Sequence, residues 1–170
     1  HLRTRRQRQM CIRDRPHGVS ESFRLAGETR MLKGYAIHGE ARVTYVSTVD
    51  RYKHQVDVVK AVEQLQESGF DVSLRLYGRG EKHALSALKA YIRANGCESR
   101  GIKYMGEVAH RNLASVYDET DIFVFASECE NMPNILLEGM ASALPVVSSD
   151  RGPMPSILRD AGLYLSLIHI

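Results

Sequence analysis

The chain has 170 residues, of which 44% are hydrophobic and 25% charged, which is enough for one domain with its own core. No apolar run approaches the roughly 20 residues that span a bilayer, so an integral membrane segment is excluded at the sequence level. The formal net charge of +3 hints at a nucleic-acid binder, but residues 1–15 alone carry +5 and the remainder carries −2, so no nucleic-acid partner is expected.

Both ends of the sequence resemble translated sequencing adapters, through RRQRQMCIRDR at residues 5–15 and LSLIHI at residues 165–170. We therefore expect residues 1–15 and 165–170 to be non-native tails and exclude them from fold reasoning. The alternative for the first tail is a basic arm that contacts phosphate backbones. Residues 16–40 are mixed polar and contain glycine, which indicates an interdomain linker before a domain at residues 41–164.

From residue 41 onward, short β-rich runs alternate with helical patterns, which indicates βαβ units and a parallel sheet. In chain order we expect strand 42–49, helix 54–68, strand 71–77, helix 81–95, strand 102–105, helix 110–117, strand 122–126, helix 133–142, strand 145–148, helix 154–159 and strand 162–165. The apolar face of the first helix is expected at Val56, Val59, Val62 and Leu65. The run IFVFA is continuously apolar, so we expect its strand at the centre of the sheet.

This order of elements predicts an α/β fold, a Rossmann-like doubly wound parallel sheet of about six strands. Right-handed crossovers place every loop that follows a strand on one rim, where ligands of such folds bind. The loops on that rim are residues 47–53, 78–81, 105–110, 127–133 and 149–154.

Two glutamates follow the expected central strand, Glu130 and Glu138, and Pro133 opens a helix between them. Their spacing corresponds to at most about 12 Å along a helix, so they can address different parts of one elongated ligand. The amides at the helix start, with the helix dipole, form an anion site suited to a diphosphate. The alternatives are an acidic residue beside a helix N-terminus for Glu130 and a solvated helix position for Glu138. Apolar neighbours favour a partnered carboxylate at Glu138.

The stretch SECENMPNILLEGMASALPVV, residues 127–147, resembles the E-x7-E signature of the group 1 (family four) retaining glycosyltransferases, whose fold is GT-B. Other landmarks follow in the same order. PHGVSESF (16–23) resembles the link between the two GT-B lobes, YVSTVDRYKHQ (45–55) the diphosphate loop, and LYGRGE (76–81) the glycine loop near the nucleotide. The resemblance implies the C-terminal lobe of a GT-B fold, truncated at both ends and missing its N-terminal lobe.

Carried over residue by residue, the resemblance implies that Lys53 neutralises the donor diphosphate, Glu138 accepts hydrogen bonds from the ribose, and Glu130 holds hydroxyls of the transferred sugar. Lys53 and Glu130 are thus the expected catalytic residues. The other expected donor-binding residues are Asn131, Met132, Pro133, Asn134, Thr48, Gly78, Arg79 and Val108. Neither a metal nor a cofactor is expected, because no Asp-x-Asp pair is present.

The sequence departs from the family pattern at Thr48, where relatives carry an arginine. One diphosphate contact is therefore lost, or Arg51 or Arg79 supplies it. Taken alone, Lys53 would more often be a surface lysine, and Gly78 is compatible with a turn glycine. The histidines His54, His83 and His110 lack metal-ligand spacing and are expected at helix starts or on the surface.

The expected function is transfer of a hexose from a nucleoside-diphosphate sugar to an acceptor hydroxyl, with retention at the anomeric carbon. The acceptor can be a sugar, a lipid or a polysaccharide. The fragment alone is expected to be inactive. The alternatives are a nucleotide-sugar epimerase-like protein and a noncatalytic nucleotide-binding GT-B domain. Three cysteines without metal-ligand spacing favour reduced thiols and a cytoplasmic location, with peripheral attachment to the inner face of a membrane left open.

Overall fold

The computed structural model describes residues 18–166, and its centre is a six-stranded sheet with the order β3-β2-β1-β4-β5-β6. The strands are β1 (Ala41–Val46), β2 (Val72–Tyr77), β3 (Ile102–Gly106), β4 (Ile122–Phe125), β5 (Val146–Ser149) and β6 (Leu163–Leu165). Neighbouring strands in this order pair in parallel. The predicted doubly wound parallel sheet is confirmed.

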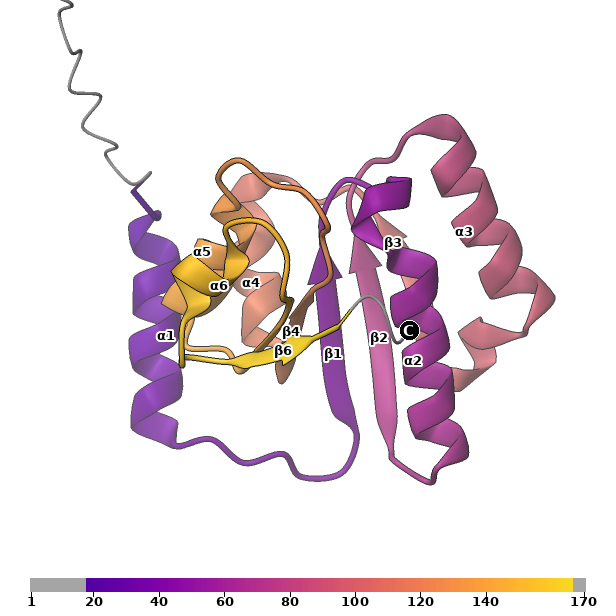
Figure 1. Cartoon of the computed structure of the whole chain (residues 1–170). Coiled ribbons are helices and arrows are strands. Elements are labelled where there is room, and N and C mark those ends of the chain that lie inside the picture. The colour runs from indigo at the N-terminus through magenta and orange to yellow at the C-terminus, as the bar shows by residue number, and fades with distance from the viewer. Residues whose placement is uncertain (1–17, 167–170) are drawn as a thin grey trace, which may run out of the picture.

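Helices cover both faces of the sheet. On one face lie α2 (Gln55–Glu67) and α3 (Lys82–Ala94), and on the other lie α1 (Glu21–Lys33), α4 (Leu113–Asp118), α5 (Asn134–Ala141) and α6 (Met154–Leu158), as Figure 1 shows. Short 3-10 helices add η1 (Arg51–Lys53), η2 (Cys97–Arg100) and η3 (His110–Asn112). Within residues 18–166 no helix combines the length and apolar character needed to cross a bilayer.

The strand β4 lies inside the sheet, between β1 and β5, as its continuous apolar run predicts. Phe123 and Phe125 are 0% and 2% exposed, because helices cover both faces of this strand. The order of strands reverses between β1 and β4. Their carboxyl-end loops, residues 47–53 and 127–133, therefore meet at the switch point where ligands of doubly wound sheets bind.

The structure corrects the interpretation of residues 16–40, where we expected only a linker. Helix α1 occupies residues 21–33 and packs against α4 and α5. Its described residues that are buried are Phe23 and Gly27, so the helix lacks the broad apolar stripe that identifies an amphipathic helix in sequence. Specific contacts, described below, hold it instead.

Smaller differences concern element ends and one helix face. Strand β1 stops at Val46, three residues before its predicted end, because the chain turns into the rim loop there. Of the four residues expected on the apolar face of α2, Leu65 is exposed, at 44%, whereas Val58, which was not expected on that face, is buried. Leu165, assigned to a tail from the sequence, ends β6, and the first tail, residues 1–15, lies outside the described residues.

Candidate active site

The loop after β1, residues 47–53, is held in place by hydrogen bonds from two buried polar side chains. The hydroxyl of Tyr45 donates to the carbonyl oxygen of Lys53 at 2.7 Å. The amide of Gln55 donates to the Thr48 carbonyl oxygen and to the Ser47 hydroxyl, both at 2.9 Å. Because Tyr45 and Gln55 are 1% and 4% exposed, these hydrogen bonds are shielded from water and hold residues 47–53 in one conformation.

The loop after β4 is joined to the first loop by a backbone hydrogen bond and is also held by β5. The amide of Glu128 donates to the carbonyl oxygen of Tyr52 at 2.9 Å. From the neighbouring strand β5, the hydroxyl of Ser149 donates to the carbonyl oxygen of Ser127 at 2.5 Å. The two loops therefore form one surface at the switch point.

Lys53 and Glu130 meet on this surface. The ammonium of Lys53 forms an ion pair with Oε1 of Glu130 and lies 5.0 Å from the ring of Tyr52 and 5.6 Å from that of Phe125. Lys53 is only 7% exposed, so the interpretation as a surface lysine is wrong. The carboxylate and the aromatic faces offset the cost of burying its charge.

A cavity of about 210 Å³ opens above this pair, and we call it the lysine cavity. It is lined by Ser47, Thr48, Lys53, Phe125, Glu130, Met132, Pro133, Asn134 and Ile135. Six of the residues expected from the sequence thus line one cavity: Lys53, Glu130, Thr48, Met132, Pro133 and Asn134. The position that carries an arginine in relatives lies in its wall as Thr48.

A second cavity, of about 450 Å³, lies on the other side of the α5 start, and we call it the histidine cavity. It is lined by Gly18, Val19, Ser20, His110, Asn134, Leu137 and Glu138. Asn134 lines both cavities, so they adjoin at the first residue of α5. Together they form an elongated site with Lys53 and Glu130 at one end and Glu138 at the other.

Glu138 places a buried carboxylate at the wall of this site. Its side chain is 9% exposed, and its Oε1 lies 2.8 Å from Nε2 of His110. Its Oε2 is buried and has no hydrogen-bond partner among the described residues. A solvated position for Glu138 is therefore wrong. Because an unpaired buried carboxylate oxygen is costly, the arrangement suits a ligand that donates hydroxyl groups there.

Tyr117 lies behind Glu138 in the core. Burial, and after it the negative charge of Glu138, raise the pKa of the Tyr117 phenol well above its usual value. The phenol is therefore neutral at any physiological pH, and its hydroxyl has no hydrogen-bond partner in the described part of the chain.

Within residues 18–166, no group of three or more His, Cys, Asp or Glu side chains is placed to hold a metal ion.

Four expected donor-binding residues lie outside the walls of the two cavities: Gly78, Arg79, Val108 and Asn131. Gly78 has a φ of 137°, and a Cβ there would overlap the carbonyl oxygen of Ser47, so its role is to let the second rim loop approach the first. Arg79 and Asn131 are exposed, and Val108 packs against the core.

The start of α5 offers fewer amide donors than expected. Pro133 has no amide hydrogen, and the amide of Asn134 donates to the carbonyl oxygen of Met132 at 3.0 Å. Of residues 131–134, which were expected to bind the donor, Pro133 and Asn134 therefore have no free backbone amide to donate to a ligand in this structure. The charge of Lys53 becomes correspondingly more important for an anion.

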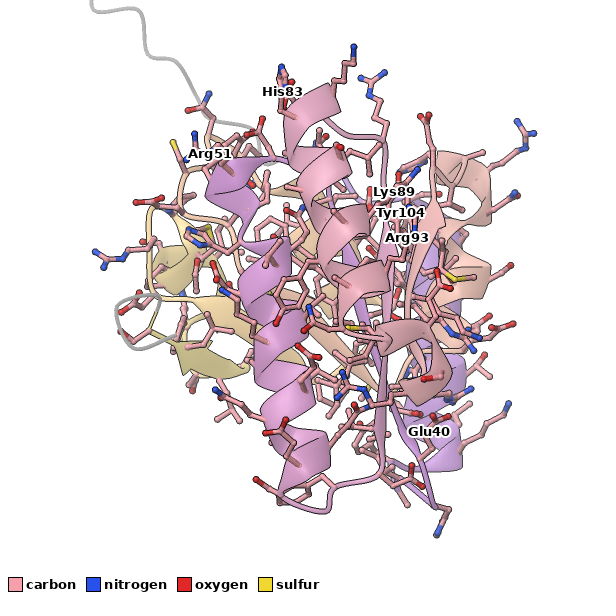
Figure 2. The ribbon with its side chains drawn as sticks, turned by 90° about the vertical axis from the view of Figure 1, so that its right-hand side faces the viewer. Glu40, Arg51, His83, Lys89, Arg93 and Tyr104 are labelled. Atoms are coloured by element: carbon pink, nitrogen blue, oxygen red, sulfur yellow. The ribbon has the colours of Figure 1, made fainter. Side chains whose placement is uncertain are left out.

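Arg51 does not replace the missing arginine. It lines a separate hollow of about 100 Å³ with residues of α2 and α3, and Figure 2 shows it on the same side of the molecule as His83, at the opposite end from Glu40. The lysine cavity therefore contains Lys53 without a second cation from this position.

His110 is the contact that the sequence did not reveal. It begins η3 and its side chain is 63% exposed, as expected, but it also bonds Glu138 across the cavity. The two residues are 28 positions apart and lie on either side of β4, so no local spacing connects them. Gln55 lies in the segment 45–55 that resembles the diphosphate loop of the family. Its burial beneath residues 47–53 could not be predicted from a single sequence.

Comparisons with known proteins show which family model and which relatives the chain matches. The sequence profile of the family described as glycosyl transferases group 1 matches residues 40–167. The chain is 23% identical over 149 residues to spore coat protein SA of Bacillus subtilis (strain 168), covering 85% of this chain and 39% of that protein. It is 29% identical over 129 residues to the amylovoran biosynthesis glycosyltransferase AmsK of Erwinia amylovora, covering 72% and 31%. The chain thus spans well under half the length of these relatives.

Solved structures share the fold. Anabaena Alr3699/HepE in complex with UDP and glucose superposes with a TM-score of 0.66 at 20% identity, covering 87% of this chain and 39% of that chain. The C-terminal domain of the group 1 glycosyl transferase LpcC of Francisella tularensis superposes with a TM-score of 0.63 at 21% identity, covering 87% and 76%. The expected fold, that of a GT-B C-terminal lobe, is confirmed.

Proposed function

Because this chain belongs to the family of glycosyl transferases group 1, we propose that it binds the nucleotide-sugar donor of a retaining hexosyltransferase. The observation that carries the proposal is the pair of adjoining cavities, with a buried cation in one and an unpaired carboxylate oxygen in the other. The family match gives no support to the epimerase-like alternative. The basic-arm alternative concerns residues 1–15, which lie outside the described residues.

The site divides a donor into three parts. The nucleoside occupies the histidine cavity, where ribose hydroxyls donate to the carboxylate of Glu138. The diphosphate lies across the start of α5 near Asn134, and its charge is countered by Lys53. The hexose occupies the lysine cavity, where Glu130 accepts from its hydroxyls.

Charge development explains the place of Lys53. In the proposed reaction the bond between the anomeric carbon and a diphosphate oxygen breaks and a bond from that carbon to the acceptor oxygen forms. Negative charge grows on the departing diphosphate, which takes up the proton that the acceptor hydroxyl releases. A fixed ammonium beside it stabilises that charge more in the transition state than in the ground state. The donor then competes with Glu130 for Lys53, which leaves Glu130 free for the sugar.

The relatives suggest which donor to test first. Alr3699/HepE has been solved with UDP and glucose and with UDP-glucose, so we propose a uridine diphosphate sugar ahead of guanosine or adenosine donors. We propose that the acceptor binds to a partner lobe, which would be part of a longer enzyme. Transfer then requires that lobe, so this chain alone binds the donor without turning it over.

The first prediction concerns Lys53 and Glu138. Isothermal titration of the 170-residue chain with UDP, GDP and ADP should show one nucleotide binding at a single site. Lys53→Ala and Glu138→Ala should each weaken that binding by about tenfold to a hundredfold, because each removes a charge-assisted contact.

The matched control is Lys89→Ala, an exposed lysine on α3 whose ammonium lies 5.1 Å from the ring of Tyr104, at the outer edge of the sheet in Figure 2. It should leave affinity unchanged. The proposed function would be refuted if none of the three nucleotides binds. It would also be refuted if Lys53→Ala, Glu138→Ala and Lys89→Ala all bind the nucleotide with equal affinity.

A further inference from the structure

Helix α1 contacts His110, a wall residue of the histidine cavity, through the side chain of Phe23. Phe23 is 1% exposed, and its ring packs edge-on against the imidazole of His110 with centroids 5.7 Å apart and planes at 74°. It also contacts Tyr117, whose centroid lies 5.6 Å away. The ring therefore stands between the core and the residue that bonds Glu138.

The helix that carries Phe23 is held rigidly. One turn on, Gly27 lies so close to the C-terminal end of α5 that a Cβ would overlap the carbonyl oxygen of Ala141. Three residues further, Arg30 donates to three carbonyl oxygens at helix ends and in loops, those of Tyr117, Thr120 and Ser142, at 2.5, 3.0 and 3.2 Å. The spacing 23, 27, 30 places these contacts on one face of α1.

His110, in contrast, is held by little else. It opens the 3-10 helix η3, which has no side-chain cap, and 63% of its side chain is exposed. In the part of the chain that the structure describes, the contacts given for its ring are the Phe23 ring and Oε1 of Glu138. An exposed imidazole with two free torsions would otherwise spread over several rotamers.

We propose that Phe23 is a positioning residue for donor recognition. By fixing the His110 ring it keeps Nε2 on Oε1 of Glu138, which holds that carboxylate in one orientation at the wall of the histidine cavity. The position of α1 is thereby coupled to recognition of the ribose hydroxyls. This inference rests on the proposed function, because it takes the Glu138 carboxylate as the acceptor for the ribose.

The test compares two nucleotides that differ only at the ribose. Affinities for UDP and for 2′,3′-dideoxyuridine diphosphate are measured on the wild-type chain and on Phe23→Leu, His110→Ala and the double variant. If GDP or ADP is the nucleotide that binds, its dideoxy form is used. The ratio of the two affinities is independent of the folded fraction, so a loss of stability alone does not change it.

Wild type should prefer the ribonucleotide by about tenfold or more, because an unpaired carboxylate remains when the hydroxyls are absent. Phe23→Leu should reduce this preference at least threefold, and so should His110→Ala. Phe23→Leu added to His110→Ala should change it no further, since both act through one ring. Leu88→Ala, a fully buried substitution on α3, is the control that lowers stability and leaves the ratio unchanged.

The outcomes separate the two proposals. If wild type binds no nucleotide, or binds the ribo and dideoxy forms equally, the proposed function or its ribose assignment fails, and the inference fails with it. If wild type discriminates and Phe23→Leu discriminates equally well, only the inference is overturned. Equal, additive losses from Phe23→Leu and His110→Ala would also overturn it, because Phe23 would then act by another route.

Discussion

At the scale of single residues, the site depends on two charged side chains, Lys53 and Glu138, whose interactions with the surrounding protein differ. Lys53 is satisfied without a ligand, by Glu130 and two aromatic faces, whereas Glu138 keeps one buried oxygen without a partner. Lys53 is thus held in place to bind an anionic group, and the Glu138 carboxylate has an oxygen left to accept a hydrogen bond from a hydroxyl group. Together the two residues fit a ligand with a diphosphate and a ribose.

Thr48 provides a prediction at this scale, because it lines the lysine cavity at the position where the resemblance to the family implies an arginine. Thr48→Arg should add a guanidinium beside the diphosphate and tighten UDP binding by about threefold to tenfold, measured by titration at low salt. Arg51→Ala should have no effect, since Arg51 lines a different hollow. Unchanged or weaker binding in Thr48→Arg would show that the diphosphate lies elsewhere.

At the scale of elements, helix α1 is part of the domain although its sequence is weakly amphipathic. Gly27→Ala should force α1 away from α5, because the added methyl overlaps the Ala141 carbonyl. We expect the free energy of unfolding to fall by about 1–3 kcal/mol in urea denaturation. Leu32→Ala, at a position 89% exposed on the same helix, should change it little. An unchanged midpoint for Gly27→Ala would mean that α1 does not dock as described.

The central strands are clamped at their amino ends by Asp121. Its carboxylate accepts from the backbone amide, Nε and Nη2 of Arg42, at 2.9, 2.8 and 2.9 Å. Hydrogen bonds from Arg42 hold the pKa of Asp121 below its usual value. A lowered native pKa stabilises the fold above the unfolded pKa of about 3.9, and that contribution disappears as the pH falls through the native value.

Asp121→Asn should therefore destabilise the chain at pH 7 by only about 1 kcal/mol, because Arg42 is partly exposed to solvent. Urea denaturation of wild type and variant at pH 7, 5 and 3 should show the difference shrinking below about pH 4. A difference that grows as the solution is acidified would have the wrong sign for this assignment.

At the scale of the whole molecule, the sequence predicted the architecture because its signals are local. Each predicted strand and helix from residue 42 onward is present, and IFVFA lies at the centre because an uninterrupted apolar run suits a strand buried on both faces. The site was predicted as far as its residues lie in two rim loops that follow strands. Lys53, Thr48 and Glu130 come together for this reason.

The remainder could not be predicted because it depends on contacts between distant segments. Helix α1 is held by Gly27 and by Arg30, neither of which gives a periodic apolar signal. The bond from His110 to Glu138 depends on how η3 and α5 flank β4. Arg51 was a plausible substitute from the sequence, and only the direction of the η1 turn assigns it to another hollow.

The most direct test of the account is a crystal structure of the chain with UDP bound. We predict the ribose hydroxyls within hydrogen-bond distance of the Glu138 carboxylate, the diphosphate across Asn134, and the ammonium of Lys53 turned from Glu130 towards phosphate. Ordered UDP at any other place, for example the hollow beside Lys89 and Arg93 at the edge of the sheet, would contradict it.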